Sequence, residues 1–468
     1  MLEIVLKCRP PLDPAFLPAS LWNRAYRNLV RSSGRGRPLA VALERGDGAV
    51  SVYRSEVLPH EAPWTELNER YTERLLKFLL WQRGGWRVTV AGDAAIAAHL
   101  RQVYSPSGAR AFDFEFMGER VYSRPMTIDS VPYERAPEAR EACLHLGGHF
   151  DGCRIGFDLG GSDRKCAAVM DGEVVHTEEV VWDPYFQPDP QYHYDHIRDT
   201  LRRAAAHLPR VDAIGGSAAG IYVNNEVRVA SLFRGVPLEL FETRVRRLFF
   251  ELQKEWGGVP FVVANDGEVT ALAGSMALGD GALLGVSMGT SQAGGYVTPQ
   301  GGITTWLNEL AFAPVDYRAH APADEWSGDR GVGVQYFSQQ AVARLAPAAG
   351  IELPEGMPAA EKLAAVQRLA DGGDARARSV FETIGTYFGY AVAHYADFYE
   401  LRHVLVLGRV LSGAAGELIV TRASEVLREE FPELHERIRL HVPGEKEKRH
   451  GQAVAAASLP EIPKQRET

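Results

Sequence analysis

The chain has 468 residues, 46% hydrophobic and 24% charged, the balance of a soluble globular protein with room for two or three domains. Its formal net charge of −9 disfavours a surface built to neutralise nucleic acid, and no apolar run is long enough to span a membrane. Four cysteines do not make a disulfide framework, and the prolines near the N-terminus exclude a secretory signal, so we expect a cytoplasmic protein.

The first 150 residues have the pattern of an α/β domain with no recognisable chemistry. The expected elements are a helix over 20–30, two strands around the turn Gly46-Asp47-Gly48, a helix over 64–79, a strand over 86–92 and a helix from Ala94 capped by Asp93. The arginines between 24 and 37 are interpreted as a solvated helix face and loop, because the chain is acidic and lacks a helix-turn-helix pattern.

From Ile155 onwards, strands alternate with helices, and two glycine turns stand out. "DLGGS" (158–162) and "GTSQAGG" (289–295) each lie between two short apolar runs, at the tip of an expected strand–turn–strand unit. Glycine lets the backbone approach phosphate oxygens, and the N–H groups of such a turn form an anion-binding concavity. Either turn alone is an ordinary hairpin; together they predict a polyphosphate site.

Two further carboxylates follow apolar runs. Asp158 would lie beside the phosphates, where a carboxylate is repulsive unless a cation intervenes, so it predicts Mg²⁺ held through water. Asn265 and Asp266 follow "PFVVA", where a carboxylate projects from the end of a buried strand. Phosphoryl transfer to a hydroxyl needs an acceptor for the proton at such a place. The alternative is that Asp266 only caps the helix that begins near Gly267.

The order of these pieces resembles the actin–sugar kinase–heat-shock ATPase superfamily, and most closely its ROK branch (repressor, open reading frame, kinase). The resemblance covers about 153–459. In ROK kinases the corresponding segments read like "DIGGT", "GTGIGGG" and "VLGGGVS", where this chain has "DLGGS", "GTSQAGG" and "VLGRVLS" (406–412). An Asn-Asp pair after a buried strand completes the pattern.

This resemblance implies a two-lobed α/β fold, the actin-like ATPase (ribonuclease H-like) fold, here with an additional N-terminal α/β domain. We expect domains at 1–150, 151–264 with a C-terminal helix over 450–460 returning to it, and 265–449. ATP and Mg²⁺ are the implied cofactors, and a homodimer is a family-level expectation. The residues implied at the nucleotide are Asp158, Gly160, Gly161, Ser162, Gly289, Thr290, Ser291, Gly294 and Gly408.

On the sugar side, the resemblance makes Asp266 the general base and gives sugar contacts to Asn265 and Glu309. ROK proteins usually carry a structural zinc, with a His after a Gly-Glu pair and three cysteines. Here the His position is Phe312, and the cysteine positions hold Glu325, Ser327 and Val332. Such a set cannot form the usual tetrahedral site. We predict no zinc, and a loop held by packing that includes Phe312 and Trp326.

Two other patterns are weaker. The segment "CLHLGGHFDGC" contains Cys143, His145, His149 and Cys153, whose types suit zinc but whose spacing matches no known motif, so structural or incidental use is preferred. Arg234 lies in "ASLFRGV", a poor match to the sugar segment of the family, and is either a contact for an anionic substrate or a surface residue.

The sequence therefore predicts an ATP-dependent carbohydrate kinase that acts on a small sugar or sugar derivative, with no nucleic-acid or membrane partner. The first alternative is a catalytically silent sugar or nucleotide sensor; a DNA-binding repressor is disfavoured because no winged-helix pattern is present. The second is an activator of a radical dehydratase, whose iron–sulfur cluster needs cysteine ligands in close array, while no cysteine lies beyond Cys166. The acceptor sugar and the donor, ATP or polyphosphate, stay open.

Overall fold

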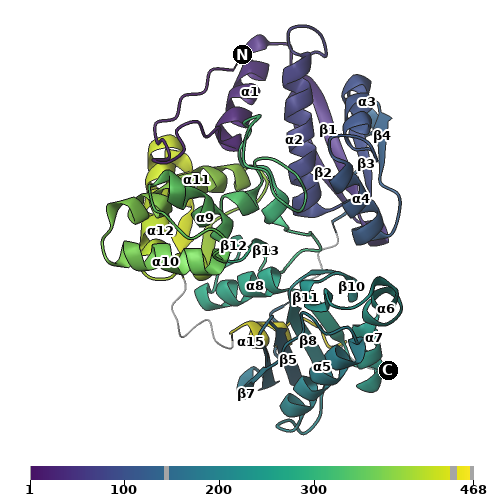
Figure 1. Cartoon of the computed structure of the whole chain (residues 1–468). Coiled ribbons are helices and arrows are strands. Elements are labelled where there is room, and N and C mark those ends of the chain that lie inside the picture. The colour runs from purple at the N-terminus through teal and green to yellow at the C-terminus, as the bar shows by residue number, and fades with distance from the viewer. Residues whose placement is uncertain (1, 142–146, 443–450, 464–468) are drawn as a thin grey trace. The chain divides into compact units, whose positions relative to one another are not determined.

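The computed structural model describes residues 2–141, 147–442 and 451–463. The chain forms two compact units (Figure 1). Unit 1 comprises Met1–Ala142, Val286–Gly294 and Trp306–Val442, and unit 2 comprises Cys143–Gly285, Gly295–Thr305 and Pro443–Thr468. This division differs from the three expected domains, because the N-terminal residues and most of the expected second lobe form one unit, while residues 265–285 fall in the other.

The N-terminal region, residues 2–141, contains one four-stranded sheet and the helices that pack on it. The strand order is β2-β1-β3-β4. The elements are α1 (Ala19–Ser33), β1 (Arg37–Glu44), β2 (Val50–Val57), α2 (Thr65–Arg83), β3 (Arg87–Ala91), α3 (Ala94–Val103), α4 (Ala111–Glu115) and β4 (Thr127–Val131).

The local predictions for this region are confirmed. A short 3₁₀ turn, Gly46–Gly48, joins β1 to β2, and the two strands pair in antiparallel register. Asp93 caps α3, since its carboxylate accepts hydrogen bonds from the backbone N–H groups of Ala95 and Ile96 at 2.9 and 3.0 Å. These features were predictable because each depends on neighbours in the sequence.

The rest of unit 1 has a second four-stranded sheet, of order β13-β12-β14-β15, and a group of helices. The boundary between the units falls within β12 and β13. The elements are β12 (Leu283–Met288), β13 (Gln292–Val297), α9 (Gln339–Ala348), α10 (Ala359–Asp371), α11 (Ala375–Tyr395), β14 (His403–Leu407), α12 (Ala414–Glu430), α13 (Pro432–Arg437) and β15 (Arg439–His441). Helix α11 is buried along most of its length and packs against α12 and α1.

Unit 2 is built on a five-stranded mixed sheet of order β11-β8-β5-β6-β7. Strands β5, β8 and β11 are parallel, while β6 and β7 continue antiparallel from β5. The elements are β5 (Cys153–Leu159), β6 (Asp163–Met170), β7 (Glu173–Val181), α5 (Pro190–Ala205), β8 (Ala213–Ala218), β9 (Ile221–Val223), β10 (Glu226–Val229), α6 (Leu238–Leu240), α7 (Leu248–Glu255), β11 (Phe261–Asn265), α8 (Asp266–Leu278) and α15 (Gly451–Ala457).

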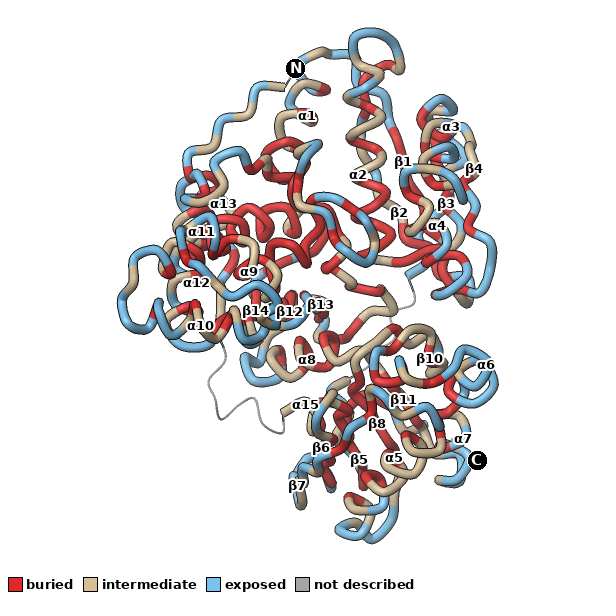
Figure 2. The backbone as a smooth tube through the Cα atoms, in the orientation of Figure 1, coloured by how far each residue is buried: buried red, intermediate tan, exposed pale blue. Residues whose placement is uncertain are grey.

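Strand β5 is buried along its whole length, and its alternate residues serve two different layers (Figure 2). Ile155 and Phe157 belong to the apolar core that includes residues of α5 and α7. Arg154 and Gly156 face α15, where the Arg154 guanidinium donates to the carbonyl of Pro460 at 2.7 Å. A Cβ on Gly156 would lie 1.7 Å from the carbonyl oxygen of Ala453, so only glycine allows this contact.

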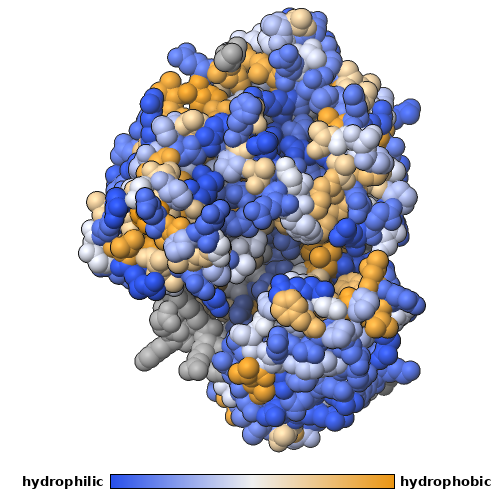
Figure 3. Space-filling view, viewed as in Figure 1, coloured by the Kyte–Doolittle hydropathy of each residue, from blue (hydrophilic) through white to orange (hydrophobic). Residues whose placement is uncertain are grey.

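None of the described helices combines the length and the apolar character that a membrane span requires. Figure 3 shows a face that is mostly hydrophilic, with apolar residues in scattered patches. Single exposed apolar residues are normal on a folded protein.

We predict that Gly156→Ala destabilises the protein by about 1–3 kcal/mol, because α15 must move away from the sheet to admit the methyl group. Gly46→Ala is the matched control, since a Cβ there meets nothing within 4 Å. Thermal unfolding monitored by circular dichroism measures both. Equal melting temperatures for the two variants would contradict the close packing of α15.

Candidate active site

The carboxyl ends of β5, β8 and β11 bring polar residues to one edge of the sheet in unit 2. Asp158 on β5 pairs in register with Ser217 on β8, and Asn265 at the end of β11 pairs with Ala218. Asp266 follows as the first residue of α8. Ends of parallel strands are where α/β proteins commonly bind ligands. Asp158, Asn265 and Asp266, predicted from separate motifs, therefore share one edge of one sheet.

Asp158 is buried and has two polar partners. The hydroxyl of Ser217 donates to its Oδ1 at 2.7 Å, and Nζ of Lys165 lies 3.6 Å from its Oδ2. Burial nevertheless raises the pKa of Asp158, and the nearby charge of Asp163 adds to the effect. Lys165 also donates to Asp163 at 2.7 Å. Neither Ser217 nor Lys165 was predicted from the sequence. The expected hairpin could have indicated Lys165, because its register places Lys165 opposite Asp158.

Asp266 carries the more strongly shifted carboxyl. Burial raises its pKa to about 6, and the charge of Asp158 contributes in the same direction. Burial raises the pKa of Tyr222, and the charge of Asp266 adds to this shift. A carboxyl that titrates near pH 6 is a better proton acceptor than an ordinary aspartate, and still ionises at neutral pH.

The cap of α8 is Asn265. Its Oδ1 accepts from the N–H of Gly267 at 2.7 Å, and its amide donates to the carbonyl of Gly220 at 2.7 Å. The same N–H also lies 2.9 Å from Oδ1 of Asp266. The N-cap of α8 is therefore Asn265 and not Asp266, because the side chain of Asn265 accepts a hydrogen bond from the first turn of this helix.

The two glycine hairpins differ in their surroundings. In the first, the N–H of Gly160 bonds to the carbonyl of Asp163 at 2.9 Å, and Tyr185 covers Gly161 so closely that no side chain would fit there. Ser162 bonds to Asp163 at 2.9 Å. In the second hairpin, in unit 1, Thr290 and Ser291 are exposed.

Gly289 begins the second turn, and Gly294 lies within β13. A Cβ on Gly289 would have no neighbour closer than 3.9 Å, which leaves room for a ligand. A Cβ on Gly294 would clash with the carbonyl of Asn308. The strand before this turn also requires glycine at position 408. Gly408 has a φ of 107°, and a Cβ there would lie 2.4 Å from the carbonyl oxygen of Met288. Packing alone therefore requires glycine at 408.

Glu309, the predicted sugar contact in unit 1, is partly buried and is positioned by the N-terminal region. Its N–H donates to the carbonyl of Trp81 at 2.9 Å, and the N–H of Asn308 donates to the carbonyl of Gln82 at 2.8 Å. Trp81 and Gln82 belong to the last turn of α2. The end of this helix therefore fixes the backbone that carries Glu309.

The loop 309–338, which holds the positions of the missing zinc ligands, packs on aromatic side chains of the N-terminal region. Phe312 lies 4.4 Å from Trp81 between ring centroids and 5.3 Å from Trp326. Phe112 and Phe116 lie 5.1 and 5.6 Å from Trp326. The prediction that Phe312 and Trp326 take part in holding this loop is confirmed, and three aromatic partners from the N-terminal region are added.

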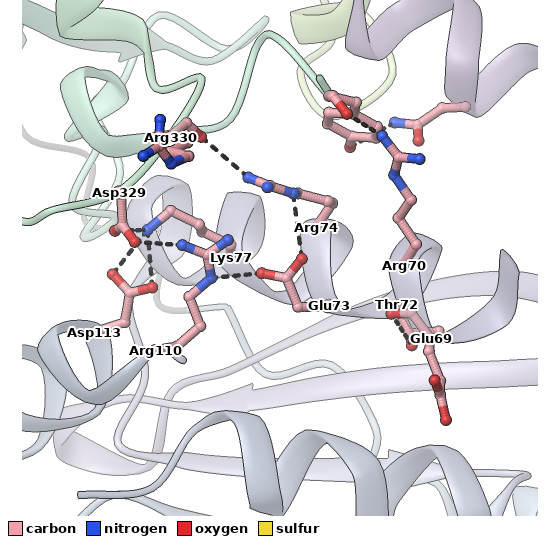
Figure 4. A network of polar contacts seen from close by, with 12 residues as sticks. Glu69, Arg70, Thr72, Glu73, Arg74, Lys77, Arg110, Asp113, Asp329 and Arg330 are labelled. Atoms are coloured by element: carbon pink, nitrogen blue, oxygen red, sulfur yellow. Dashed lines mark hydrogen bonds and ion pairs between the residues drawn. The ribbon is translucent and has the colours of Figure 1, made fainter. Parts of the chain in front are cut away.

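Beside the aromatic side chains lies a buried ion cluster, defined as Glu73, Lys77, Arg110, Asp113 and Asp329 (Figure 4). Nζ of Lys77 donates to Asp113 at 2.8 Å and to Asp329, and Arg110 pairs with both Asp329 and Glu73. The side chains of Lys77 and Asp113 have no exposed surface.

Only Asp329 of this cluster comes from the loop 309–338. Burial alone would raise the pKa of Asp329, but the charges of Lys77 and Arg110 outweigh it and hold that pKa below its usual range. The loop is thus tied to α2 and to the start of α4 by charges that are largely shielded from water.

Among the described residues, no three His, Cys, Asp or Glu side chains form an arrangement that could hold a metal ion. Cys143 and His145 lie outside the described residues, and Cys153 is buried at the start of β5. Arg234 is exposed, and its guanidinium stacks 4.0 Å above the ring of Tyr185. The two repelling carboxylates Asp158 and Asp266 fit a cation held through its water shell rather than by direct ligands.

No family model matches the chain, and no curated protein does. Solved structures do. A ROK hexokinase from Thermus thermophilus aligns with a TM-score of 0.52 and 18% identity, covering 66% of this chain and 97% of that chain. A ROK family transcriptional regulator, a homologue of the E. coli MLC protein, aligns with a TM-score of 0.52 and 19% identity, covering 66% and 78%.

These likenesses define the fold class: the chain has an actin-like ATPase fold of mixed α/β layers. Within that class it has the fold of ROK-family structures. The predictions of fold class and of resemblance are confirmed at this level.

We predict that Lys77→Met destabilises the protein by about 3–5 kcal/mol, because it leaves Asp113 and Asp329 buried and uncompensated. The control is Arg35→Met, which removes the partner of Glu61 in a pair whose side chains are both half exposed, and should cost less than about 1 kcal/mol. Chemical unfolding measures the difference. If Lys77→Met lowers the free energy of unfolding no more than the control does, the cluster does not stabilise the protein.

We also predict that Asp266→Asn stabilises the protein in a pH-dependent way. In the folded protein the pKa of this carboxyl is raised to about 6, above that of an aspartate in the unfolded chain. Above the pKa of the unfolded chain, the aspartate ionises more easily unfolded than folded, which lowers the free energy of unfolding. The gain in melting temperature should grow from pH 4 to about pH 6 and then level off at a few degrees. Asp195→Asn, at a half-exposed carboxyl of α5 that pairs with Arg198, is the control and should give no comparable gain. A gain that is the same at pH 4 and pH 8 would contradict the shift.

Proposed function

We propose that this protein transfers the γ-phosphoryl group of ATP to a hydroxyl group of a sugar or sugar derivative, with Asp266 as the general base. The observation that carries the proposal is the position of Asp266, at the end of a buried parallel strand and beside Asp158, with its pKa raised to about 6. A base with that pKa is ionised at neutral pH and accepts a proton readily as the hydroxyl oxygen attacks.

Two further side chains are assigned to the sugar. Asn265 uses one N–H and one lone pair to hold Gly220 and Gly267, which leaves one N–H and one lone pair for a hydroxyl group. Glu309 is assigned to the sugar from the family resemblance, and its backbone is fixed by α2. The identity of the sugar depends on groups beyond these three and is left to experiment.

Two glycine hairpins are assigned to nucleotide binding in this proposal. The hairpin at 160–162 and the open turn at 289–291 supply backbone N–H groups for the phosphates. Asp158 is the residue that would orient Mg²⁺ through its waters, and when bound this ion neutralises charge on the phosphates. Lys165, between Asp158 and Asp163, adds a cation at the first hairpin.

The N-terminal region takes the structural role that zinc has in ROK proteins. The ion cluster and the aromatic contacts of Phe312 and Trp326 support this assignment, because they fix the same loop without thiolate or imidazole ligands. The N-terminal region is then part of the enzyme, since α2 also fixes Glu309.

The alternative is a sensor that binds sugar or nucleotide without turnover. The likeness to a transcriptional regulator and the rebuilt loop 309–338 favour it. The kinase proposal is preferred because Asn265 and Asp266 retain the arrangement that general-base catalysis needs, with the cap and the base on separate residues.

We predict that wild-type protein releases ADP and forms a sugar phosphate with at least one member of a panel of sugars and amino sugars. Asp266→Asn should lower this turnover by two or more orders of magnitude, the usual scale for general acid–base catalysis. Binding of ATP and sugar, measured by calorimetry, should largely survive because the lost interaction belongs to the transition state. The donor is tested by replacing ATP with polyphosphate.

The matched control is Asp195→Asn, which should keep full turnover. Undiminished turnover in Asp266→Asn would remove this residue from the mechanism. Tight binding of a sugar by the wild-type protein, with no phosphorylation of any sugar that it binds, would establish the sensor instead.

A further inference from the structure

A segment of the N-terminal region crosses one face of its sheet from edge to edge. The chain leaves β4, one edge strand, at Val131, and Arg140 pairs with Val50 of β2, the other edge strand, through backbone hydrogen bonds of 2.8 and 2.9 Å. A 3₁₀ turn at Tyr133–Arg135 contacts β1 and β3 on the way. We name residues 132–141 the strap.

The sheet face under the strap is polar. Ala42, Thr89 and Asp129 lie directly opposite one another on β1, β3 and β4, and Glu44 lies opposite Arg87. The alternate residues Leu43, Val88 and Val90 have no exposed surface, so the apolar face of the same sheet points the other way. The strap therefore roofs the hydrophilic side of the sheet.

Strap and sheet enclose a groove of about 580 Å³. This volume is in the range of small-molecule sites. Four arginines line it, Arg87, Arg101, Arg135 and Arg140, with two acids, Glu44 and Asp129. The groove thus carries a formal charge of 4 − 2 = +2 in a chain of net charge −9.

The arginines are not equally engaged. Arg87 donates to Asp129 at 2.7 Å and lies 3.8 Å from Glu44, so it pairs with both acids of the groove. Arg101 donates to the carbonyl of Ile128 at 2.7 Å. Within the described part of the chain, the side chains of Arg135 and Arg140 form no hydrogen bond or ion pair. Two guanidinium groups on the roof are left for an anion.

We propose that this groove is a binding site for a small metabolite that carries a phosphate or carboxylate group. The anionic group lies on Arg135 and Arg140, since guanidinium groups bind oxyanions through paired, charge-assisted hydrogen bonds. The hydroxyl of Thr89 and the carboxylate of Asp129, on the floor, suit the hydroxyl groups of the same metabolite.

The end of the strap connects the groove to the segment that carries Glu309. Glu141 pairs with Arg45 and Ser51 and accepts a hydrogen bond from the indole N–H of Trp306 at 3.1 Å. Trp306 precedes Glu309 by three residues, and Arg83 of α2 stacks on its ring. A ligand that shifts or stiffens the strap acts on this segment through Glu141. The regulatory part of this inference rests on the proposed function; the binding part does not.

The test is calorimetry on the full chain with inorganic phosphate, glucose 6-phosphate and citrate. At least one probe should bind, and Arg135→Gln/Arg140→Gln should weaken it about tenfold or more. The control is Arg9→Gln/Arg37→Gln, which removes two exposed arginines of unit 1 that do not line the groove, and should leave affinity unchanged. Both variants should keep the wild-type melting temperature.

Hydrogen exchange with the bound probe gives a readout that needs no activity. Protection should rise over 132–141 and over 306–310, and only in proteins that keep Arg135 and Arg140. The Michaelis constant for the sugar, where turnover is found, should shift with the same probe. If no probe binds, or if the control variant loses as much affinity, the site is refuted. Protection that stops at 141 would refute the link to Glu309.

Discussion

A lysine without solvent contact organises unit 1. Lys77 places a positive charge in the interior, and burying such a charge is tolerable only if opposite charges meet it in good geometry. Asp113 comes from the N-terminal region and Asp329 from the loop 309–338, so neither segment alone satisfies the lysine. Because a partly assembled cluster is worse than an apolar core, the two segments are obliged to fold against each other. The ion cluster therefore contributes more to how the loop 309–338 is placed on the N-terminal region than to the net stability of the fold.

In unit 2, buried carboxylates lie at a sheet edge without a comparable set of cations. Asp158 and Asp266 stand at one edge of the sheet with fewer compensating partners than their burial demands, and both have raised pKa values. Carboxylates kept at high energy in a rigid frame are typical of sites where a cation or substrate completes the electrostatics. One chain thus contains a cluster in which Lys77 and Arg110 hold the carboxylate of a loop, and a pair of carboxylates at a sheet edge that is available for chemistry.

The structural features that could be predicted from the sequence are those that depend on near neighbours or on known motifs. The β1–β2 hairpin, the Asp93 cap and the glycine turns are local, and the order of motifs was enough to predict the fold class. The partnership of the N-terminal region with loop 309–338 was missed, because Lys77 and Asp329 are 252 positions apart and neither stands in a motif. Ser217 and Lys165 were missed for a similar reason: each looks ordinary until strand register places it beside Asp158.

The docking of α15 has a consequence for synthesis. The face of the sheet that contains Gly156 and Gly215 is closed by backbone atoms of residues 453–456, which a ribosome adds almost 300 residues after β5. Until then the central strands of unit 2 have only one covered face, through the whole period in which the second half of unit 1 emerges. Nascent chains of this protein should therefore carry an open, glycine-lined sheet surface, the kind of surface that chaperones engage during translation.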